Sequence, residues 1–235
     1  MIQSPFSNLP PVVKNLLIIN IIMFLPVLMI DRFHADGWFV QHLGLYYFNS
    51  PFFKPWQIIT YMFMHGGFEH ILFNMFALFS FGPTLEYIMG SKRFFNFYFL
   101  CGIGAALLQI GVQAYEVHAI TGSFAEPFSS ALDQNAIEHL QAIYLFPTVG
   151  ASGAIFGILI AFGMIYPNAE LMILFIPVPV KAKYVISVYV IIELISGFGQ
   201  FAGDNVAHFA HIGGALIGFI MVKLWRLQGP RNFYN

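Results

Sequence analysis

Hydrophobic residues are concentrated in six long segments, separated by shorter polar or aromatic stretches. The segments cover about residues 12–31, 67–88, 93–115, 151–166, 183–200 and 206–226. A helix needs roughly 20 apolar residues to cross the hydrocarbon core of a bilayer, and the segment at 151–166 is shorter than that. The pattern predicts an all-α membrane protein with six transmembrane helices, of which the fourth is short.

Composition agrees with a membrane protein and excludes other classes. Of the 235 residues 58% are hydrophobic and 9% are charged, whereas soluble domains carry about 25% charged residues. The net charge is −1 and no basic cluster occurs, which argues against a nucleic-acid partner. The apolar stretch at 16–30 is not followed by a small-residue cleavage site, so we interpret it as a retained first transmembrane helix. The chain is expected to be one domain, 1–235.

Basic residues are distributed unequally between the two sides that alternating helices define. Arg32 and Lys54 lie on one side, and the other eight of the ten Lys and Arg residues lie on the opposite side. Because cytoplasmic loops are enriched in basic residues, we expect both termini in the cytoplasm and a multi-pass protein of a bacterial cytoplasmic membrane. The eight residues are Lys14, Lys92, Arg93, Lys181, Lys183, Lys223, Arg226 and Arg231.

Two long loops lie on the outer side. The loop at about 32–66 is rich in Trp, Tyr and Phe, which prefer the membrane interface. In the loop at 116–149, the sequence Ser130-Ala131-Leu132-Asp133 resembles a capping box and predicts a short helix to about Leu140. That loop could be a surface connector or could contact a substrate or partner.

Polar residues on three parallel helices are predicted to lie at one depth. Ser152 lies 15 residues before Pro167, and His211 lies 15 residues before Arg226, so both are about 22 Å above the inner boundary. His70 and Asn74 lie one turn apart on the second helix and reach a similar level. Because buried polar groups are costly in hydrocarbon unless they pair or face water, this coincidence indicates a functional site.

Ser152 and His211 have the chemistry of a nucleophile and its base. A serine hydroxyl attacks efficiently only if a base removes its proton. Gly153 and Gly157 on one helix, with Gly214 and Gly218 on the other, would allow the two helices to approach closely. No carboxylate is evident beside the imidazole, so we expect a Ser–His dyad rather than a triad, with Phe156 packed against the ring.

The segment before the short helix, 146–150, is expected to enter the membrane as irregular backbone, which is tolerated where it is buried in protein or lines a water-filled cavity. Hydrolysis would need that water. An oxyanion would need fixed donors, for which the amides around Ser152 and the side chains of His70 and Asn74 are candidates.

These motifs together resemble the rhomboid family of intramembrane serine proteases. The main matches are Gly150-Ala151-Ser152-Gly153, the His211–Gly214–Gly218 spacing and His70-x-x-x-Asn74. The segments 55–57 (PWQ), 65–74 (HGGFEHILFN) and 177–184 (PVPVKAKY) add to the resemblance. It differs from some members in having Gln57 after the tryptophan and Phe156 in place of a tyrosine.

The resemblance implies a compact six-helix protease with no metal or cofactor. It implies Ser152 as nucleophile and His211 as general base, with substrates that are transmembrane segments. These would enter beside the fifth helix and be cut near their outer end after a small residue. The implied oxyanion site is His70, Asn74 and the Ser152 amide, and the supporting residues are Gly150, Gly153, Phe156, Gly214, Gly218 and Trp56.

Several alternatives stay open at this point. A catalytically inactive rhomboid-like protein would bind membrane clients without cleaving them. A zinc site is conceivable at His208 and His211 or within 65–70, although the His-Glu-x-x-His motif of metalloproteases is absent. His208 is the rival to His211 as the base. Glu193 lies about 15 Å into the membrane, counted from Lys183, and a structural, gating or polar-partner role fits it equally. A homo-oligomer, an accessory subunit and the physiological substrate are not decided by the sequence.

Overall fold

The computed structural model describes residues 9–34, 37–124, 132–172, 178–199 and 207–229. Helices form in all six predicted apolar segments. They are α1 (Pro11–Pro26, extended by the π-helical turn η1, Val27–Asp31), α4 (Phe68–Met89), α5 (Ser91–Thr121), α7 (Ser152–Ile165), α8 (Ala182–Gly199) and α9 (His208–Leu224).

The connections contain shorter elements. These are α2 (Trp38–Leu43), α3 (Gln57–Thr60), the 3-10 turn η2 (Tyr61–Phe63), α6 (Gln134–Leu145) and the antiparallel strands β1 (Glu170–Met172) and β2 (Pro179–Lys181), which pair Glu170 with Lys181.

Four helical segments are long and apolar enough to cross a membrane. They are 11–31, 68–89, 91–121 and 182–199, while α7 and α9 are apolar but shorter. The described residues therefore form a helical membrane bundle, and the prediction that the helix at 151–166 is short is confirmed.

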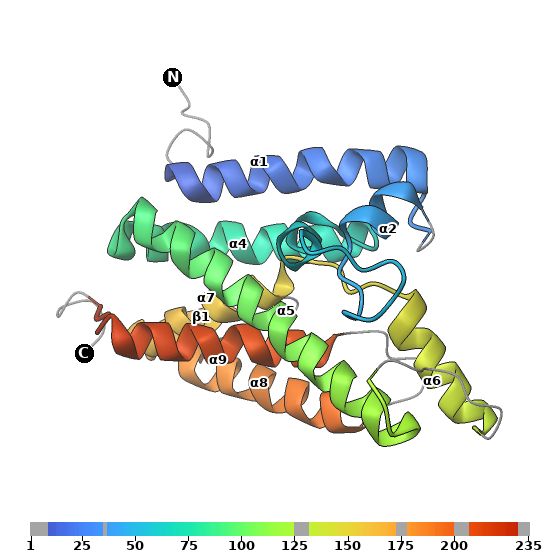
Figure 1. Ribbon diagram of the computed structural model, residues 1–235. Coiled ribbons are helices and arrows are strands. Elements are labelled where there is room, and N and C mark those ends of the chain that lie inside the picture. Colours follow the sequence, from blue (N-terminus) through green and yellow to red (C-terminus); the bar gives the residue numbers. More distant parts are fainter. Residues whose placement is uncertain (1–8, 35–36, 125–131, 173–177, 200–206, 230–235) are drawn as a thin grey trace.

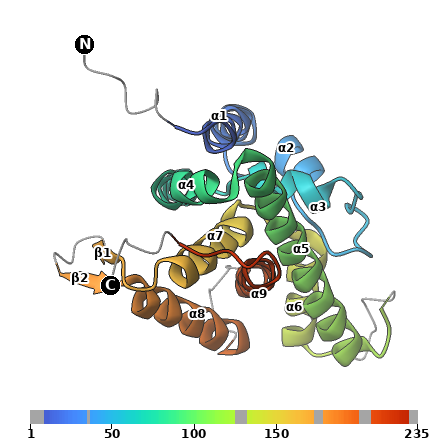
Figure 2. The same cartoon turned by 90° about the vertical axis from the view of Figure 1, so that its left-hand side faces the viewer.

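The helices are arranged around α9. It packs against α5, α7 and α8, and Figure 2 shows it nearly end-on between them. On the other side of the bundle α1 lies along α4 (Figure 1). This central position brings the first turn of α9 into contact with both α7 and α8, which becomes important for the site.

The contact between α7 and α9 depends on glycine. A side-chain carbon added at Gly214 would overlap the carbonyl oxygen of Gly153, and one added at Gly218 would lie 2.7 Å from the Cα of Gly157. The two backbones thus touch without side chains between them, as in small-residue contacts of other membrane helices. The predicted close approach of these helices is confirmed.

A buried carboxylate fixes the start of α1. Glu86, near the end of α4, accepts hydrogen bonds from the amides of Val12 and Val13 at 3.0 and 2.8 Å and from the hydroxyl of Ser91 at 2.7 Å. The first amides of a helix have no carbonyl within the helix to bond, and Pro10 supplies no side-chain cap. Glu86 therefore ties α1 to the turn between α4 and α5.

The predicted bounds of the outer-loop helix are wrong. The helix α6 begins after Asp133, whose carboxylate accepts from the Ala136 amide at 2.8 Å, and it continues to Leu145 rather than ending near Leu140. Asp133 is therefore the capping residue instead of Ser130, because an N-cap side chain bonds the amide two or three residues later. Ser130 and Ala131 lie outside the described residues.

Candidate active site

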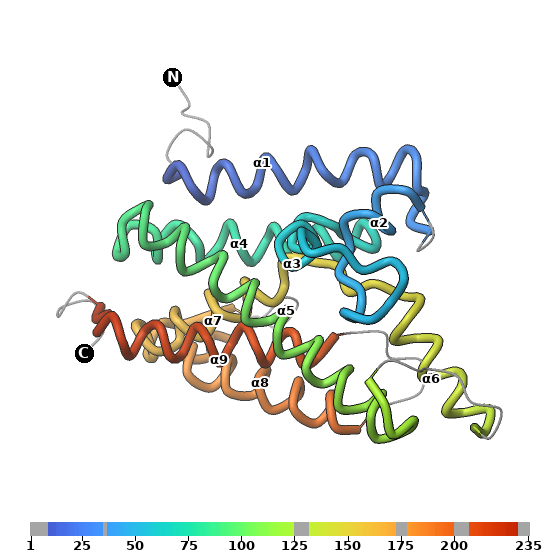
Figure 3. Tube along the Cα trace, in the orientation of Figure 1, coloured from blue at the N-terminus to red at the C-terminus, as the bar shows by residue number. Residues whose placement is uncertain are grey.

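The backbone that leads into α7 is irregular and is held by the outer loop. Leu45 and Thr148 exchange backbone hydrogen bonds at 2.9 and 2.8 Å, and the Gly150 amide donates to the Tyr61 carbonyl at 2.9 Å. Figure 3 shows this connection running from α6 past α3 before it enters α7. The predicted irregular entry is confirmed, and Ser152 is the first residue of the helix that follows.

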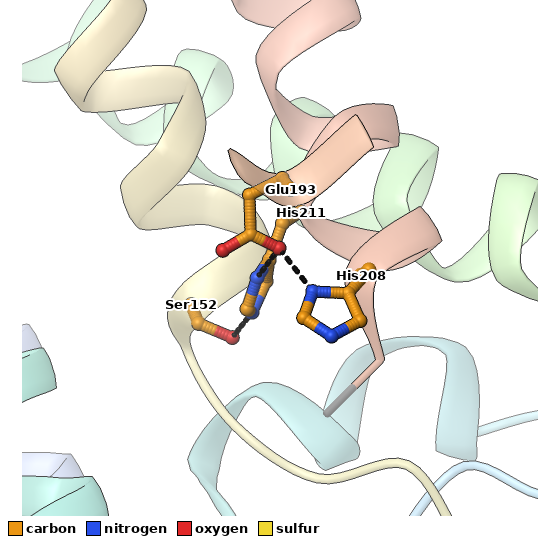
Figure 4. Close-up of polar contacts among 4 residues, drawn as sticks. All are labelled: Ser152, Glu193, His208 and His211. Carbon is orange, nitrogen blue, oxygen red and sulfur yellow. Dashed lines mark hydrogen bonds and ion pairs between the residues drawn. The ribbon is translucent and has the colours of Figure 1, made fainter. Parts of the chain in front are cut away.

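The structure brings Ser152 and His211 into direct contact. The Ser152 Oγ lies 2.7 Å from the His211 Nε2, and the ring of Phe156 stacks on the imidazole with 4.4 Å between centroids and 11° between planes. Figure 4 shows the hydroxyl at the tip of α7 and the imidazole on α9. A serine hydroxyl that donates here requires an unprotonated Nε2, so the proton of the neutral ring is on Nδ1.

A carboxylate also contacts the imidazole, so the expectation that none lies beside it is wrong. The Oε2 of Glu193, on α8, lies 2.8 Å from the His211 Nδ1 and 2.7 Å from the His208 Nδ1 (Figure 4). Glu193 is buried, with 8% of its surface exposed. His208, the predicted rival for the base, contacts this carboxylate. Counting residues along α8 predicted the depth of Glu193, but not the direction in which its side chain points.

His70 lies beside the nucleophile. A side-chain carbon at Gly150 would lie 2.7 Å from the His70 Nε2 and 3.5 Å from the Ser152 Oγ, so both groups border the same small space. Gly150 keeps that space open and has φ +128°, a conformation that side chains disfavour. The His70 Nδ1 accepts from the Gly66 amide at 3.4 Å, which leaves the proton of the neutral ring on Nε2, facing this space.

Asn74 is one turn further along α4 and is buried. Its amide donates to the His70 carbonyl at 2.9 Å. The two residues lie on the same face of α4, as the four-residue spacing predicts.

Comparison with known proteins identifies the family. The family model described as "Rhomboid domain" matches residues 53–227, which is most of the chain and contains every site residue named above. The chain belongs to the rhomboid family.

Three relatives illustrate how much of this rhomboid is shared. It is 29% identical over 164 residues to Rhomboid protein 1, mitochondrial, of Saccharomyces cerevisiae, a match that covers 70% of this chain and 40% of the relative. It is 32% identical over 164 residues to Rhomboid protease GluP of Bacillus subtilis, covering 70% and 25%. It is 31% identical over 172 residues to Rhomboid protease AarA of Providencia stuartii, covering 71% and 54%. The matches therefore span about half or less of these relatives.

The outer loop of this rhomboid is organised by a residue for which the sequence predicted no role. Gln57 is fully buried. Its carbonyl accepts from the Lys54 amide at 3.0 Å, and its amide donates to the Phe52 carbonyl at 3.0 Å and to the Gln41 carbonyl at 3.3 Å. The predicted supporting residue Trp56 is half exposed and donates to the His42 carbonyl at 3.0 Å. Both side chains hold the loop that borders the entry to α7.

His65 is buried beside His70. Its side chain is fully buried, and its ring centroid lies 5.1 Å from that of His70. Burial, and secondarily the charge that His70 would carry, lower the pKa of His65 from 6.5 to about 3. The ring is therefore neutral at physiological pH, and its position fits a role in bracing the loop.

We expect His65 to make this rhomboid sensitive to acid. The pKa of His65 is lowered from 6.5 to about 3 in the folded protein. Between these two pH values the unfolded chain therefore binds one proton at this residue that the folded protein does not bind. As the pH falls from 6.5 toward 3, the free energy of unfolding should decrease by about 1.4 kcal/mol per pH unit because of this residue. Thermal unfolding in detergent between pH 7 and 4 measures the slope. His65→Gln should reduce the slope. Equal slopes in wild type and His65→Gln would contradict the prediction.

Glu193, His208 and His211 also form a group that could hold a metal ion. One ligand atom from each lies within 4.8 Å of the others, and zinc binds imidazole nitrogen and carboxylate oxygen. A metal at this position would take the Nδ1 of both histidines, which now contact Glu193. Metal binding and the observed hydrogen bonds are thus alternative uses of the same atoms.

Proposed function

We propose that this rhomboid is an intramembrane serine protease that cleaves peptide bonds in or near the transmembrane segments of other membrane proteins. The observation that carries the proposal is the 2.7 Å contact between the Ser152 Oγ and the His211 Nε2. Ser152 is the first residue of α7, directly after a segment of irregular backbone. Two relatives from different bacteria, GluP and AarA, bear the name rhomboid protease.

In the proposed reaction Ser152 attacks the carbonyl carbon of the scissile bond while His211 accepts the hydroxyl proton on Nε2. The tetrahedral intermediate carries a negative oxygen. His211 then gives its proton to the leaving amine, the C–N bond breaks, and an acyl-enzyme on Ser152 remains. Water, deprotonated by the same imidazole, releases the acid product and restores the hydroxyl.

Three groups are suited to stabilise the oxyanion. The amides of the first turn of α7 lack helical carbonyl partners, and the amide of Ser152 is the first of them. The Nε2 proton of His70 faces the space beside Gly150 and Ser152, and Asn74 lies one turn further along α4. We include these groups, with the supporting residues Gly153, Phe156 and Gly214, in the proposed site.

Loss of one oxyanion donor should slow turnover without abolishing it. His70→Ala and Asn74→Ala are each expected to lower kcat by about 10²–10³, since one donor has that effect in soluble serine proteases, and to leave labelling of Ser152 detectable. Steady-state cleavage of a transmembrane substrate in proteoliposomes measures this. Wild-type kcat in both variants would remove these side chains from the oxyanion site.

The proposal includes a topology and a location. We infer six membrane crossings within a single domain, 1–235, with α7 and α9 crossing as the shorter helices and both termini in the cytoplasm of a bacterium. The distribution of Lys and Arg supports this orientation. Substrates would approach laterally beside α8, which exposes Val188, Ile191 and Ile195.

Cleavage by purified protein distinguishes this function from two rivals. We expect proteoliposomes that contain the wild-type chain to cleave a single-span substrate, and to keep that activity after treatment with EDTA and 1,10-phenanthroline. Activity lost on chelation and restored by zinc would favour a metalloenzyme built on Glu193, His208 and His211. Substrate that is captured but left intact by the folded wild-type protein would favour an inactive client-binding rhomboid.

A further inference from the structure

We propose that Glu193 is a positioning residue that completes a Ser152–His211–Glu193 triad, with His208 holding the carboxylate in place. The inference rests on the proposed protease function and deepens it. It assigns a role to an ionisable residue inside a membrane helix, where such a group is rarely present without a function.

The contacts form one continuous chain. The Ser152 Oγ donates to the His211 Nε2 across 2.7 Å, and the His211 Nδ1 donates to the Glu193 Oε2 across 2.8 Å. A neutral imidazole carries one proton, and the carboxylate can only accept. Glu193 therefore selects the tautomer with its proton on Nδ1, which leaves the Nε2 lone pair free for the serine proton.

The charge of Glu193 also suits the reaction. When the proton moves from the Ser152 Oγ to the His211 Nε2, the imidazole becomes a cation in a largely buried position, where 12% of the side chain is exposed. A carboxylate at 2.8 Å from Nδ1 converts that cation into half of an ion pair. The Nδ1 proton stays on His211 throughout, and Glu193 is not protonated, as in soluble triads.

His208 fixes the oxygen that His211 uses. Its Nδ1 donates to the same Oε2 at 2.7 Å, and the two imidazole rings are nearly perpendicular, at 88°. The carboxylate thus accepts from two directions. Close packing supports this arrangement, because a side-chain carbon at Gly197, one turn after Glu193 on α8, would lie 3.2 Å from the Cβ of His208.

The imidazole of His211 is consequently restrained on three sides. Ser152 contacts one nitrogen, Glu193 contacts the other, and Phe156 stacks on the ring face at 4.4 Å. A flip of the ring would break both hydrogen bonds at once. Glu193 therefore orients the base as well as polarising it.

The test compares Glu193→Gln and Glu193→Asp with wild type, using the full chain in proteoliposomes. Glu193→Gln retains size but loses the charge, so kcat should fall by about 10²-fold or more with little change in KM, because the step affected is the chemistry. Glu193→Asp keeps the charge and should recover part of the loss. Glu86→Gln is the matched control, because it also neutralises a buried membrane-helix carboxylate but one that contacts α1. It should lower thermal stability and leave kcat unchanged.

A spectroscopic measurement gives a readout that does not depend on turnover. In ¹⁵N-histidine-labelled wild-type protein, a far-downfield proton bound to the His211 Nδ1 should be visible by NMR. It should disappear in His211→Ala and shift strongly upfield in Glu193→Gln. If the Glu193 variants fail to fold, this measurement on wild-type protein still tests the hydrogen bond between the His211 Nδ1 and Glu193.

The outcomes separate this proposal from the proposed function. If wild type cleaves, Ser152→Ala does not, and Glu193→Gln has wild-type kcat, the triad is wrong and the protease stands. Absence of the downfield proton in active wild-type protein also overturns the triad. A folded wild-type protein that does not cleave overturns both, and so does activity that chelators abolish.

Discussion

Ser152→Ala should reduce cleavage of a transmembrane substrate in proteoliposomes to the level of empty liposomes, a loss of at least about 10⁴-fold. The variant removes the Ser152 Oγ, which lies 2.7 Å from the His211 Nε2, and with it the possibility of an acyl-enzyme. His211→Ala should be equally inactive, because the hydroxyl is then without its base.

His208→Ala serves as the control for that pair. It removes a neighbouring histidine of the same helix turn that bonds to Glu193 and leaves the Ser152–His211 contact in place, so part of the activity should remain. Thermal unfolding of all three variants confirms that they are folded. Full activity of Ser152→Ala would contradict the proposed mechanism, and an inactive His208→Ala with an active His211→Ala would exchange the roles of the two histidines.

Gly214→Ala should cause a large loss of both activity and stability. The added methyl group would overlap the carbonyl oxygen of Gly153, so α7 and α9 would have to move apart. Such overpacking typically costs about 1–3 kcal/mol of stability. A displacement of the order of 1 Å between reacting groups costs about 10²-fold in rate, so kcat should fall by at least that factor. Cleavage assays and thermal unfolding in detergent measure both effects.

Gly111→Ala is the matched control for Gly214→Ala. Gly111 also lies within a membrane helix, α5, but a side-chain carbon there meets nothing within 4 Å. The substitution should leave kcat unchanged. The unfolding temperature should rise slightly, because alanine is a better helix former than glycine. If Gly214→Ala behaves like Gly111→Ala, the close contact of α7 and α9 does not control the site.

Features that depend on local sequence were predictable. Apolar runs located the six main helices, because membrane helices are defined by hydrophobic length. The predicted ends lie within about two residues of the observed ones, except that α5 continues to Thr121 rather than ending at 115. Counting residues from Pro167 and Arg226 placed Ser152 and His211 at one depth, and the structure brings them into contact. The small-residue faces of both helices also predicted their close packing.

Features that depend on how helices rotate against each other were not predictable. The depth of Glu193 was counted from Lys183 and that of His211 from Arg226, and about 7 Å separated the two counts. A glutamate side chain spans most of that difference, but only if α8 turns it toward α9, as the packing at Gly197 does. No sequence pattern encodes that rotation.

Details of the loops were also not predictable from the sequence. Two residues in 130–133 could cap a helix, and only the backbone geometry selected Asp133. Gln57 looked like a mere departure from the family pattern, yet its side-chain amide group bonds to five backbone groups of the outer loop. Such long-range side-chain bonds depend on the folded path of the loop, so hydrophobic patterning does not reveal them.

The central claim is that Ser152 is a nucleophile activated by His211, and labelling tests it most directly. Folded wild-type protein in detergent or liposomes is treated with a fluorophosphonate, and the modified peptide is identified by mass spectrometry. The account predicts a single adduct on Ser152, lost in Ser152→Ala and strongly reduced in His211→Ala. Folded wild-type protein without an adduct, or with an adduct that persists in Ser152→Ala, would contradict it.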